Sequence, residues 1–382
     1  AMPNPVRRTC DKTVVTLMVL LLLMGLVTLF SATYYPKAAT GDALAAVKKQ
    51  LIGVALGAAA CVTLSRVPYR VFRRPKVTLL LLAASALMLI LVIIPGIGVS
   101  INGSRRWLNI FGLSMQPSEF AKYAMVIFMA GALDRRGEAI RRLFTGIVPL
   151  LVVPGVMFLL ILEQPNLSTG GSILICALVM LFAAGIKKRH MALLGAGGFI
   201  VGAFYAWSAP YRRERLLSFR NPFAKMSDVG YQLSQSLIAL GSGGLFGMGL
   251  GQGRQKFAYL PYPESDFIFA IVGEDFGLVG CVTVIALFVR FVLAGLRVSL
   301  ACRDRFGCLL GTGITSMIGL QAFINMGVVT GILPTTGLPL PFFSAGGTSV
   351  SVMMAAVGVL LSISRENGAR IVEPTDQQSG GR

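Results

Sequence analysis

The 382-residue chain carries 35 Lys and Arg residues against 16 Asp and Glu, a formal net charge of +19, yet only 13% of its residues are charged and 55% are hydrophobic. A soluble domain carries about 25% charged residues, and a soluble chain with half that density would expose large apolar patches and aggregate. The composition therefore excludes a soluble globular protein and indicates an integral membrane protein. The one histidine, His190, excludes a histidine-based metal site, and the six cysteines have no CxxC spacing that would indicate a metal or disulfide framework.

Uncharged windows separated by basic clusters predict membrane-spanning helices of about 20 residues each. The first eight cover Thr13–Ser31, Gln50–Leu64, Val77–Ile94, Pro117–Leu133, Phe144–Leu162, Gly170–Ile186, Met191–Ser208 and Phe267–Leu296. The later stretch Phe306–Ser364 carries no charge and is too long for one span. Pro334, Gly337 and two further prolines break its middle, so it predicts two spans joined by a re-entrant or tight apolar loop. The fold class expected is an all-α polytopic membrane protein with about ten transmembrane helices.

Lys and Arg residues in short loops set the orientation of such a protein, because they stay on the cytoplasmic side. Here they gather in alternate connections, at residues 66–76, 135–142, 187–189 and 297–305. We therefore expect both termini in the cytoplasm, with residues 1–12 as the N-terminal segment, 13–364 as a single transmembrane domain and 365–382 as a disordered tail. Ala1 before Met2 indicates a cloning remnant, and no cleavable signal peptide is expected.

The opposite face of the membrane holds the segments 95–116, 163–169 and 210–266. The last is the longest connection, a large extracytoplasmic loop between the seventh and eighth helices, with Gly-rich and partly apolar stretches. Long loops of this kind usually carry function. A site on the outer face is therefore expected.

That outer face lacks histidine and cysteine, so a catalyst there needs a carboxylate as acid or base and Lys or Arg side chains to hold an anion. Asp266 stands at the start of the eighth predicted span, where it fits either a helix N-cap or a catalytic base. Glu274 lies deeper in the same span at about 80° from Asp266 around the helix, whereas Asp275 lies about 180° away. Glu274 is therefore a candidate to line the same cavity, with a helix–helix hydrogen bond as the alternative.

Basic residues near the fourth predicted span allow two interpretations each. Glu119 and Lys122 form an i, i+3 pair that fits a structural salt bridge, but Lys122 would lie one turn inside the membrane, where a charge more often serves a pathway or a ligand. Arg105 and Arg106 fit either interfacial anchors beside a tryptophan or a bidentate phosphate clamp. Arg215 in the long loop raises the same choice.

Short motifs follow one another along nearly the whole chain. They are Asn102–Leu108, Gln116–Glu119, Gly230–Gln232, Gly241–Gly251, Ser265–Phe269, Gly273–Asp275, Gly331–Gly337 and Pro341–Ser349. Each is weak alone, but their order is specific, and on them the chain resembles the SEDS family of FtsW, RodA and SpoVE. The contexts of Gln255 and of Phe342–Ser344 are most similar to FtsW and SpoVE.

The resemblance implies a peptidoglycan glycosyltransferase of the bacterial cytoplasmic (inner) membrane, which polymerises lipid II into β-1,4 glycan strands on the outer face with inversion at the anomeric carbon. It implies a class B penicillin-binding protein as transpeptidase partner, other divisome or elongasome membrane proteins as further partners, and no nucleic acid. Septal synthesis in cell division is the expected role. An elongation polymerase of the RodA type and a lipid II flippase are the alternatives.

The family's critical aspartate falls on Asp266, which the resemblance makes the catalytic base. The candidate substrate-binding residues, with the basic ones as pyrophosphate ligands, are Arg105, Arg106, Lys122, Arg215, Glu119 and Glu274. The sequence indicates no cofactor. A divalent cation would assist the chemistry, but no ligand cluster indicates a metal site.

Two departures from the family pattern limit what is carried over. Where the family commonly has an acidic turn after the fifth span, this chain has Asn166, so no charge-based role is assigned there. Where the family often has Glu and then His before the Ser/Thr-Asp-Phe motif, this chain has Tyr262 and Glu264, so any auxiliary role of that histidine is absent.

Two rival functions make different demands on the sequence. A flippase would need charges through the whole depth of the membrane and helices broken near its midplane. The polar motifs gather at one face instead, which favours an enzyme. A divisome scaffold without activity is a third interpretation, against which the intact Asp266 argues.

Cysteine accessibility tests the predicted topology. In a cysteine-free background, Cys placed at Arg135 or Arg303 should react with an impermeant reagent only after the membrane is opened, because positive loops stay inside. Cys at Arg106 should react in intact cells. Labelling of position 135 or 303 from outside would overturn the orientation.

Overall fold

The computed structural model describes residues 10–371 apart from 39–43, 102–103, 111–112, 209–212, 214–218, 226–229, 256–258 and 262. Most of the described chain is helical. The longer helices are α1 (Lys12–Ala38), α2 (Ala45–Arg66), α3 (Pro75–Ile93), α4 (Pro117–Arg136), α5 (Val148–Leu162), α6 (Leu167–Ala183), α7 (Lys188–Trp207), α9 (Tyr231–Ser242), α10 (Ile268–Leu300), α11 (Arg305–Val329) and α12 (Gly347–Ile371). Short helical segments are η1 (Tyr69–Arg73), η2 (Gly137–Arg141), η3 (Leu143–Ile147) and η4 (Pro222–Lys225).

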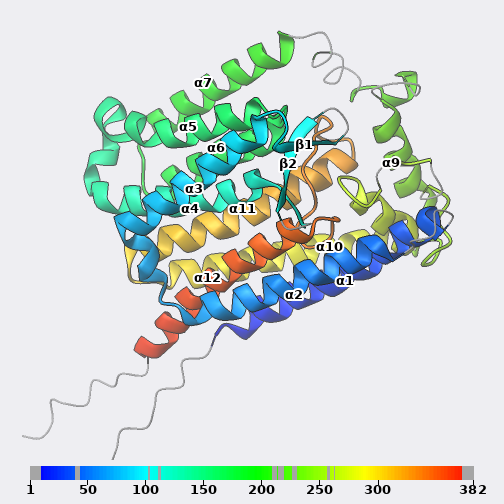
Figure 1. Ribbon diagram of the computed structural model, residues 1–382, viewed down its shortest axis with the longest axis horizontal. Helices are drawn as coiled ribbons and strands as arrows, with labels where there is room; N and C mark the ends of the chain where they lie inside the picture. The colour runs from blue at the N-terminus through cyan, green and yellow to red at the C-terminus, as the bar shows by residue number, and fades with distance from the viewer. Residues whose placement is uncertain are drawn as a thin grey trace, which may run out of the picture.

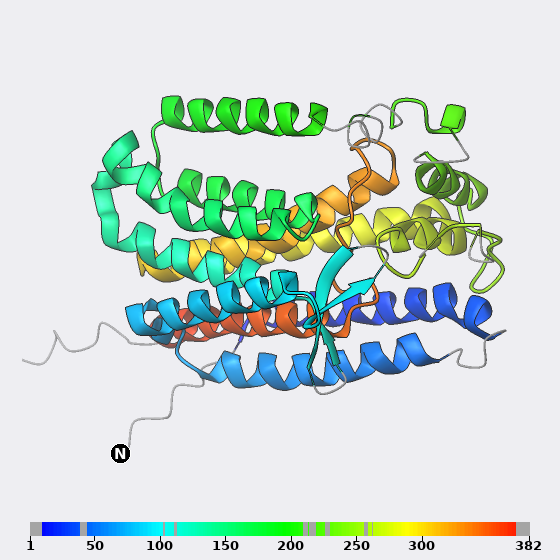
Figure 2. The same ribbon diagram turned by 45° about the horizontal axis from the view of Figure 1, so that its top comes forward.

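Most of the long helices lie side by side in one elongated bundle (Figure 1). The start of α1 and the end of α12 lie together at one end, where the Asp11 backbone N–H donates to Ser364 Oγ at 2.9 Å. α9 lies at the opposite end (Figure 1). α7 runs along the outside of the bundle (Figure 2), and apolar side chains on it, such as Phe199 and Phe204, are exposed.

Every predicted span overlaps a helix, but not every such helix has the length and composition of a span. Among the described residues, seven helices are long and apolar enough to cross a membrane: α1, α2, α3, η3 with α5, α10, α11 and α12. α6 is apolar but has only 17 residues, and α4 and α7 fall outside this set. Phe306–Ser364 contains parts of two helices, α11 and α12, separated by the proline-rich segment 330–346, as its predicted division into two spans requires.

The expectation of an all-α protein is wrong for residues 98–115. They form a three-stranded antiparallel sheet of β1 (Gly98–Ile101), β2 (Ser104–Ile110) and β3 (Leu113–Met115), in that order. Val99 pairs with Trp107, and Leu108 pairs with Met115. β-Branched and aromatic residues favour strands, but strands this short leave no mark on hydrophobicity averaged over the length of a membrane span.

α10 is not the continuous helix that the sequence predicts, because Gly277 breaks it with φ +67° and ψ −162°. A break leaves backbone groups without helical partners, and inside an apolar bundle each of these groups needs another hydrogen-bond partner. The glycine-rich loop that follows α9, residues 243–255, supplies such partners. The Leu278 N–H donates to Gly244 O, and the Met248 N–H donates to Glu274 O, both at 2.9 Å. A Cβ on Gly277 would lie 2.4 Å from a backbone nitrogen of this loop, so the contact requires glycine.

α2 and α12 pack closely through small residues. A Cβ on Gly53 would lie only 2.4 Å from the Cα of Gly347. Small residues let two helix backbones approach, which is how helix pairs associate in membranes. Gln50 of α2 accepts from the Gly346 N–H at 3.0 Å and donates to Ser344 O at 3.2 Å, so α2 also holds the loop that leads into α12.

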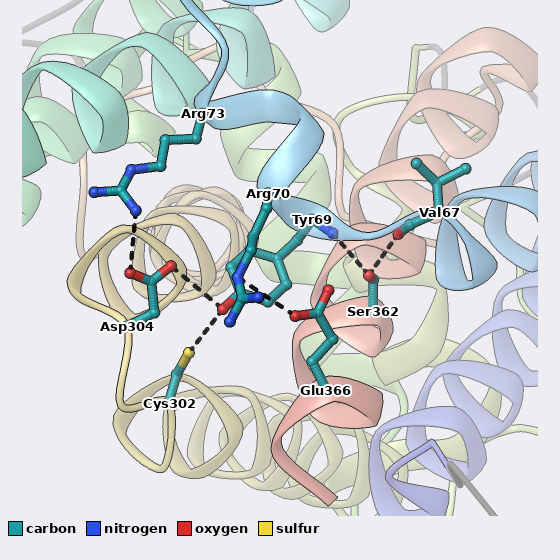
Figure 3. Close-up of polar contacts among 8 residues, drawn as sticks. All are labelled: Val67, Tyr69, Arg70, Arg73, Cys302, Asp304, Ser362 and Glu366. Carbon is teal, nitrogen blue, oxygen red and sulfur yellow. Dashed lines mark hydrogen bonds and ion pairs between the residues drawn. The ribbon is translucent and has the colours of Figure 1, made fainter. Parts of the chain in front are cut away.

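Ion pairs join helix ends near the end of α12, and Figure 3 draws those of Arg70 with Glu366 and of Arg73 with Asp304. Arg73 of η1 lies 2.9 Å from Asp134 of α4 and 3.6 Å from Asp304 beside the start of α11, and Arg70 lies 3.6 Å from Glu366 of α12. Half of the Arg73 side chain is exposed, so each pair contributes roughly 0–1 kcal/mol to stability. These ion pairs offset the negative charges of Asp134, Asp304 and Glu366. They lie at the end of the bundle that is rich in Lys and Arg and is predicted to face the cytoplasm.

The close contact between α2 and α12 predicts a stability effect. Gly53→Ala should lower the free energy of unfolding by about 1–3 kcal/mol, because the added methyl group meets backbone that cannot move aside. Thermal unfolding in detergent measures this. Gly171→Ala on α6 is the matched control, since a Cβ there meets nothing within 4 Å. Equal unfolding midpoints for the two variants would contradict the packing argument.

Candidate active site

A cavity of about 890 Å³ lies where the sheet, the α5–α6 turn, the start of α10 and the segment 334–349 meet. Its polar lining residues include Ser104, Arg106, Gln116, Asn166, Ser168, Tyr205, Gln232, Ser265, Asp266, Thr335, Thr336, Ser344, Thr348 and Ser349. Among the described lining residues, Asp266 is the one carboxylate and Arg106 the one cation. The cavity therefore combines a single acidic and a single basic group with many neutral hydrogen-bonding groups.

Asp266 lies in the turn directly before α10. The N-cap residue of α10 is Phe267, which makes no side-chain cap, so Asp266 lies one residue before the N-cap position. Ser265 Oγ donates to Asp266 Oδ1 at 3.0 Å, and Asn325 Nδ2 donates to the Asp266 backbone carbonyl at 2.7 Å. These two bonds fix the carboxylate and the main chain of Asp266 at the wall of the cavity.

Arg106 reaches the same cavity from strand β2. Its Nε donates to Gln164 O at 3.0 Å and its Nη2 donates to Pro165 O, so the guanidinium is bound to the α5–α6 turn. A Cβ on Gly337 would lie 3.3 Å from Asp266 Oδ2 and 3.9 Å from Arg106 Nη1. The distance between Asp266 Oδ2 and Arg106 Nη1 therefore cannot exceed the sum of these two distances.

Arg105 does not share this position. Successive side chains of a strand point to opposite faces, and Arg105 is exposed and does not line the cavity. The sequence placed both arginines in one candidate clamp, and the structure brings only Arg106 to the cavity. Arg215, the other arginine of that clamp, lies outside the described residues.

Glu119 and Lys122 form the salt bridge that their spacing allowed. Lys122 Nζ lies 2.9 Å from Glu119 Oε1 and donates to Gln321 Oε1 at 2.6 Å, and both charged side chains are fully buried. Neither residue lines the cavity, but Ser349, which does, donates to Glu119 Oε2 at 2.6 Å. Gln321 in turn donates to Pro339 O at 2.9 Å. The pair thus lies beneath the cavity and holds two parts of its wall.

Glu274 does not join Asp266 at the cavity, although helical geometry allowed it. It is fully buried and accepts from the Gln255 N–H at 2.9 Å. Next to it, Asp275 accepts from the Ser31 hydroxyl of α1, and this hydroxyl accepts from the Gly251 N–H at 3.3 Å. Glu274 thus contacts the glycine-rich loop directly, and Asp275 contacts it through the Ser31 hydroxyl.

Sequence reasoning from charge missed the neutral side chains of the cavity. Gln232 and Thr335 belong to motifs that carried the family resemblance, so that pattern was the signal that could have found them. Asn166 was noted only as a departure from that pattern; it caps α6, its Oδ1 accepting from the Thr169 N–H at 3.3 Å. Amides and hydroxyls of this kind suit the many hydroxyl groups of a sugar.

The donor set of the cavity does not resemble a metal site. Within the described part of the chain, no group of three or more His, Cys, Asp or Glu side chains is close enough to hold an ion. The arrangement fits instead a base that removes a proton beside a cation that holds an anion.

The chain belongs to the FtsW, RodA and SpoVE family. The model of this family, described as "Cell cycle protein", matches residues 11–369. The chain is 42% identical over 356 residues to "Stage V sporulation protein E" of Bacillus subtilis, covering 93% of this chain and 97% of that protein. It is 42% identical over 317 residues to "Probable peptidoglycan glycosyltransferase FtsW" of Geobacter metallireducens, covering 83% and 84%. The resemblance found in the motifs is confirmed.

Solved structures share the fold. One, reported as "Structural coordination of polymerization and crosslinking by a peptidoglycan synthase complex", contains a chain with a TM-score of 0.76 and 27% identity, covering 94% of this chain and 98% of that one. The crystal structure of the rod shape determining protein RodA of Thermus thermophilus gives a TM-score of 0.67 and 27% identity, covering 96% and 99%. With its apolar helices, the family membership makes this chain a multi-pass membrane protein.

The buried salt bridge predicts a stability effect that is independent of catalysis. Lys122→Met should cost about 3–5 kcal/mol, because it leaves the Glu119 carboxylate buried without its cation. The double variant Glu119→Gln/Lys122→Met should regain most of that loss. Thermal unfolding in detergent measures both. A single variant as stable as the wild type would argue against a structural role of the pair.

Proposed function

We propose that the protein is a peptidoglycan glycosyltransferase that polymerises lipid II into β-1,4 glycan strands. The name of the Geobacter relative and the fold shared with a peptidoglycan synthase complex support this class of reaction. The observation that carries the proposal is the cavity in which Asp266 and Arg106 approach one point beside Gly337 from two different elements.

The reaction requires few groups. The hydroxyl of the acceptor sugar attacks the anomeric carbon of the donor, and the bond from that carbon to pyrophosphate breaks. An α-linked donor that gives a β-linked product needs one base on the side of the attacking hydroxyl. Asp266 accepts the proton of the attacking hydroxyl. Arg106 stabilises the negative charge that develops on the departing pyrophosphate. The neutral lining residues bind the sugar hydroxyls.

The remaining candidate residues act around this centre. Arg105, on the exposed face of β2, and Arg215, which lies outside the described residues, are further candidates to bind the pyrophosphate. Lys122, Glu119 and Glu274 act as positioning residues, because the first two support the cavity wall from below and the third holds the glycine-rich loop.

The cavity end of the bundle faces the outside of the bacterial cytoplasmic membrane in this proposal. The basic cluster around Arg73, where α12 ends, then lies in the cytoplasm, as the distribution of positive charge favours. The partner is a class B penicillin-binding protein that crosslinks the strands, and the similar chain from a peptidoglycan synthase complex that coordinates polymerization and crosslinking supports such a partner. Septal synthesis is the proposed role, and elongation of the RodA type is the alternative.

One observation favours a lipid II flippase as a second candidate. α10 is broken at Gly277 beside two buried carboxylates, Glu274 and Asp275, and transporters use broken helices with buried charges. However, the glycine-rich loop takes up backbone groups on both sides of the break, and Glu274 accepts from the Gln255 N–H. These hydrogen bonds satisfy the break within the protein and leave its groups bonded to the loop. They therefore support the enzyme over the transporter.

The proposal is tested at Asp266. Asp266→Asn should lower the rate of strand synthesis by roughly 10²–10⁴-fold, because an amide cannot accept the hydroxyl proton. Its unfolding midpoint should stay near that of the wild type, since the substitution is almost isosteric. Gel analysis of the glycan made from lipid II by purified protein, with and without a class B penicillin-binding protein, measures the rate.

Glu264→Gln is the matched control, because it removes the same charge two residues away at a side chain that does not line the cavity. It should keep most of the activity. Strands of normal length and yield from Asp266→Asn would eliminate Asp266 as the base. If Asp266→Asn instead blocked lipid II translocation in vesicles and left polymerisation intact, the flippase would replace the enzyme.

A further inference from the structure

The glycine-rich loop carries large apolar side chains on its surface. Leu245 is 62% exposed, Phe246 is 81% exposed and Leu250 is 53% exposed. No charged residue occurs anywhere between Tyr231 and Gly253. Proteins in water rarely expose contiguous apolar surface of this kind unless a partner covers it. The depth of the loop in the bundle indicates which partner that is.

Hydrogen bonds to α10 give a first measure of this depth. The Leu278 N–H donates to Gly244 O at 2.9 Å, and the Val279 N–H donates to Leu245 O at 3.1 Å, so the loop lies beside this turn of α10. Leu278 is 19 residues before Arg297, which belongs to the basic end of the bundle. At a rise of 1.5 Å per residue these residues are about 28 Å apart along the helix, and the apolar layer of a membrane is about 30 Å thick. The loop therefore lies within the apolar layer, on the side of the cavity.

α1 gives the same depth independently. The Gly251 N–H of the loop donates to Ser31 Oγ at 3.3 Å. Ser31 is 19 residues after Lys12, where α1 begins at the basic end of the bundle. The two residues are again about 28 Å apart along the helix. Two helices counted from the same end thus place two points of the loop at one level.

The exposed surface of the loop adjoins apolar surface of α10. Leu278 is 55% exposed and Val279 is 52% exposed, and α10 has the length and composition of a membrane span. Exposed apolar side chains on such a span face lipid. Because Leu245 is bonded to Val279 through the main chain, the apolar side chains of the loop continue this lipid-facing surface.

The main chain of the loop meets the condition that lipid imposes. Irregular backbone at membrane depth is tolerated only where its polar groups are satisfied within the protein, since no water is present to bond them. In the loop, N–H groups that donate to acceptors within the protein are those of Gly247, Met248, Gly249, Gly251 and Gln252. A loop in water has no need of so many internal partners.

We propose that residues 243–251 form a re-entrant segment that inserts into the leaflet on the side of the cavity, where Leu245, Phe246 and Leu250 contact the acyl chains of membrane lipids. The large loop 210–266 that the sequence places outside the membrane is thus partly inside it. The inserted segment covers the break in α10, since its N–H groups already bind the carbonyls of Glu274 and Asp275. This inference goes beyond the proposed function and is independent of the reaction.

Spin labelling measures the contact with lipid. A nitroxide is attached to Phe246→Cys in the full-length, cysteine-free protein in phospholipid nanodiscs. Collisions with oxygen, which is apolar, and with a water-soluble nickel chelate are then compared. Leu23→Cys is the lipid reference, because Leu23 is exposed in the middle of α1, and Arg254→Cys is the water reference, because Arg254 is an exposed charged residue of the same loop.

The ratio of oxygen to nickel collisions at position 246 should lie within about twofold of the ratio at 23 and at least about fivefold above that at 254, because an apolar solute prefers hydrocarbon and a polar chelate stays in water. Leu250→Cys should give the same result and replaces position 246 if Phe246→Cys lowers the unfolding midpoint.

Two results would overturn the proposal. A ratio like that of position 254 at both 246 and 250 would place the loop in water. Few collisions with either reagent would show that protein, such as a second copy of this chain, covers the apolar surface in place of lipid. Neither result depends on whether the protein makes glycan, so the inserted loop and the proposed function stand or fall separately.

Discussion

Non-helical backbone inside an apolar bundle must find its hydrogen-bond partners within the protein, and this constraint shapes the whole cavity. The segment between α11 and α12 is held in this way. Asn325 donates to the carbonyls of Asp266 and Leu338, both at 2.7 Å, and the Ser344 hydroxyl donates to Ser265 O at 2.6 Å. Asp266 therefore has a fixed place because the irregular chain around it is satisfied by buried polar side chains.

The same constraint gives several charged residues a structural task. Lys122 and Glu119 are buried and tie α4 to α11 and α12, and Glu274 ties α10 to the glycine-rich loop. A buried ion pair adds little net stability, but breaking it is costly, so its geometry is well determined. These contacts hold the wall of the cavity in place through residues that do not line it.

Among the described lining residues, two opposite charges reach the cavity. Asp266 and Arg106 approach the same point beside Gly337, one from the turn before α10 and the other from strand β2. Because they come from different elements, the carboxylate and the guanidinium can contact different atoms of one bound molecule, as a base and an anion-binding group must.

The sequence by itself determined the class of the protein, its family and most of its helices, because apolar windows and ordered motifs are local properties that need no knowledge of packing. It also named Asp266 as the candidate base and Arg106 as one of six candidate substrate-binding residues. Only the tertiary structure decided which charges meet: it separated Arg105 from Arg106, turned Glu274 toward the glycine-rich loop and paired Lys122 with Glu119 below the cavity. It also revealed the sheet at 98–115 and the break at Gly277. The break at Gly277 depends on a partner outside its own helix, the loop that satisfies the broken helix, and a local pattern carries no record of such a partner.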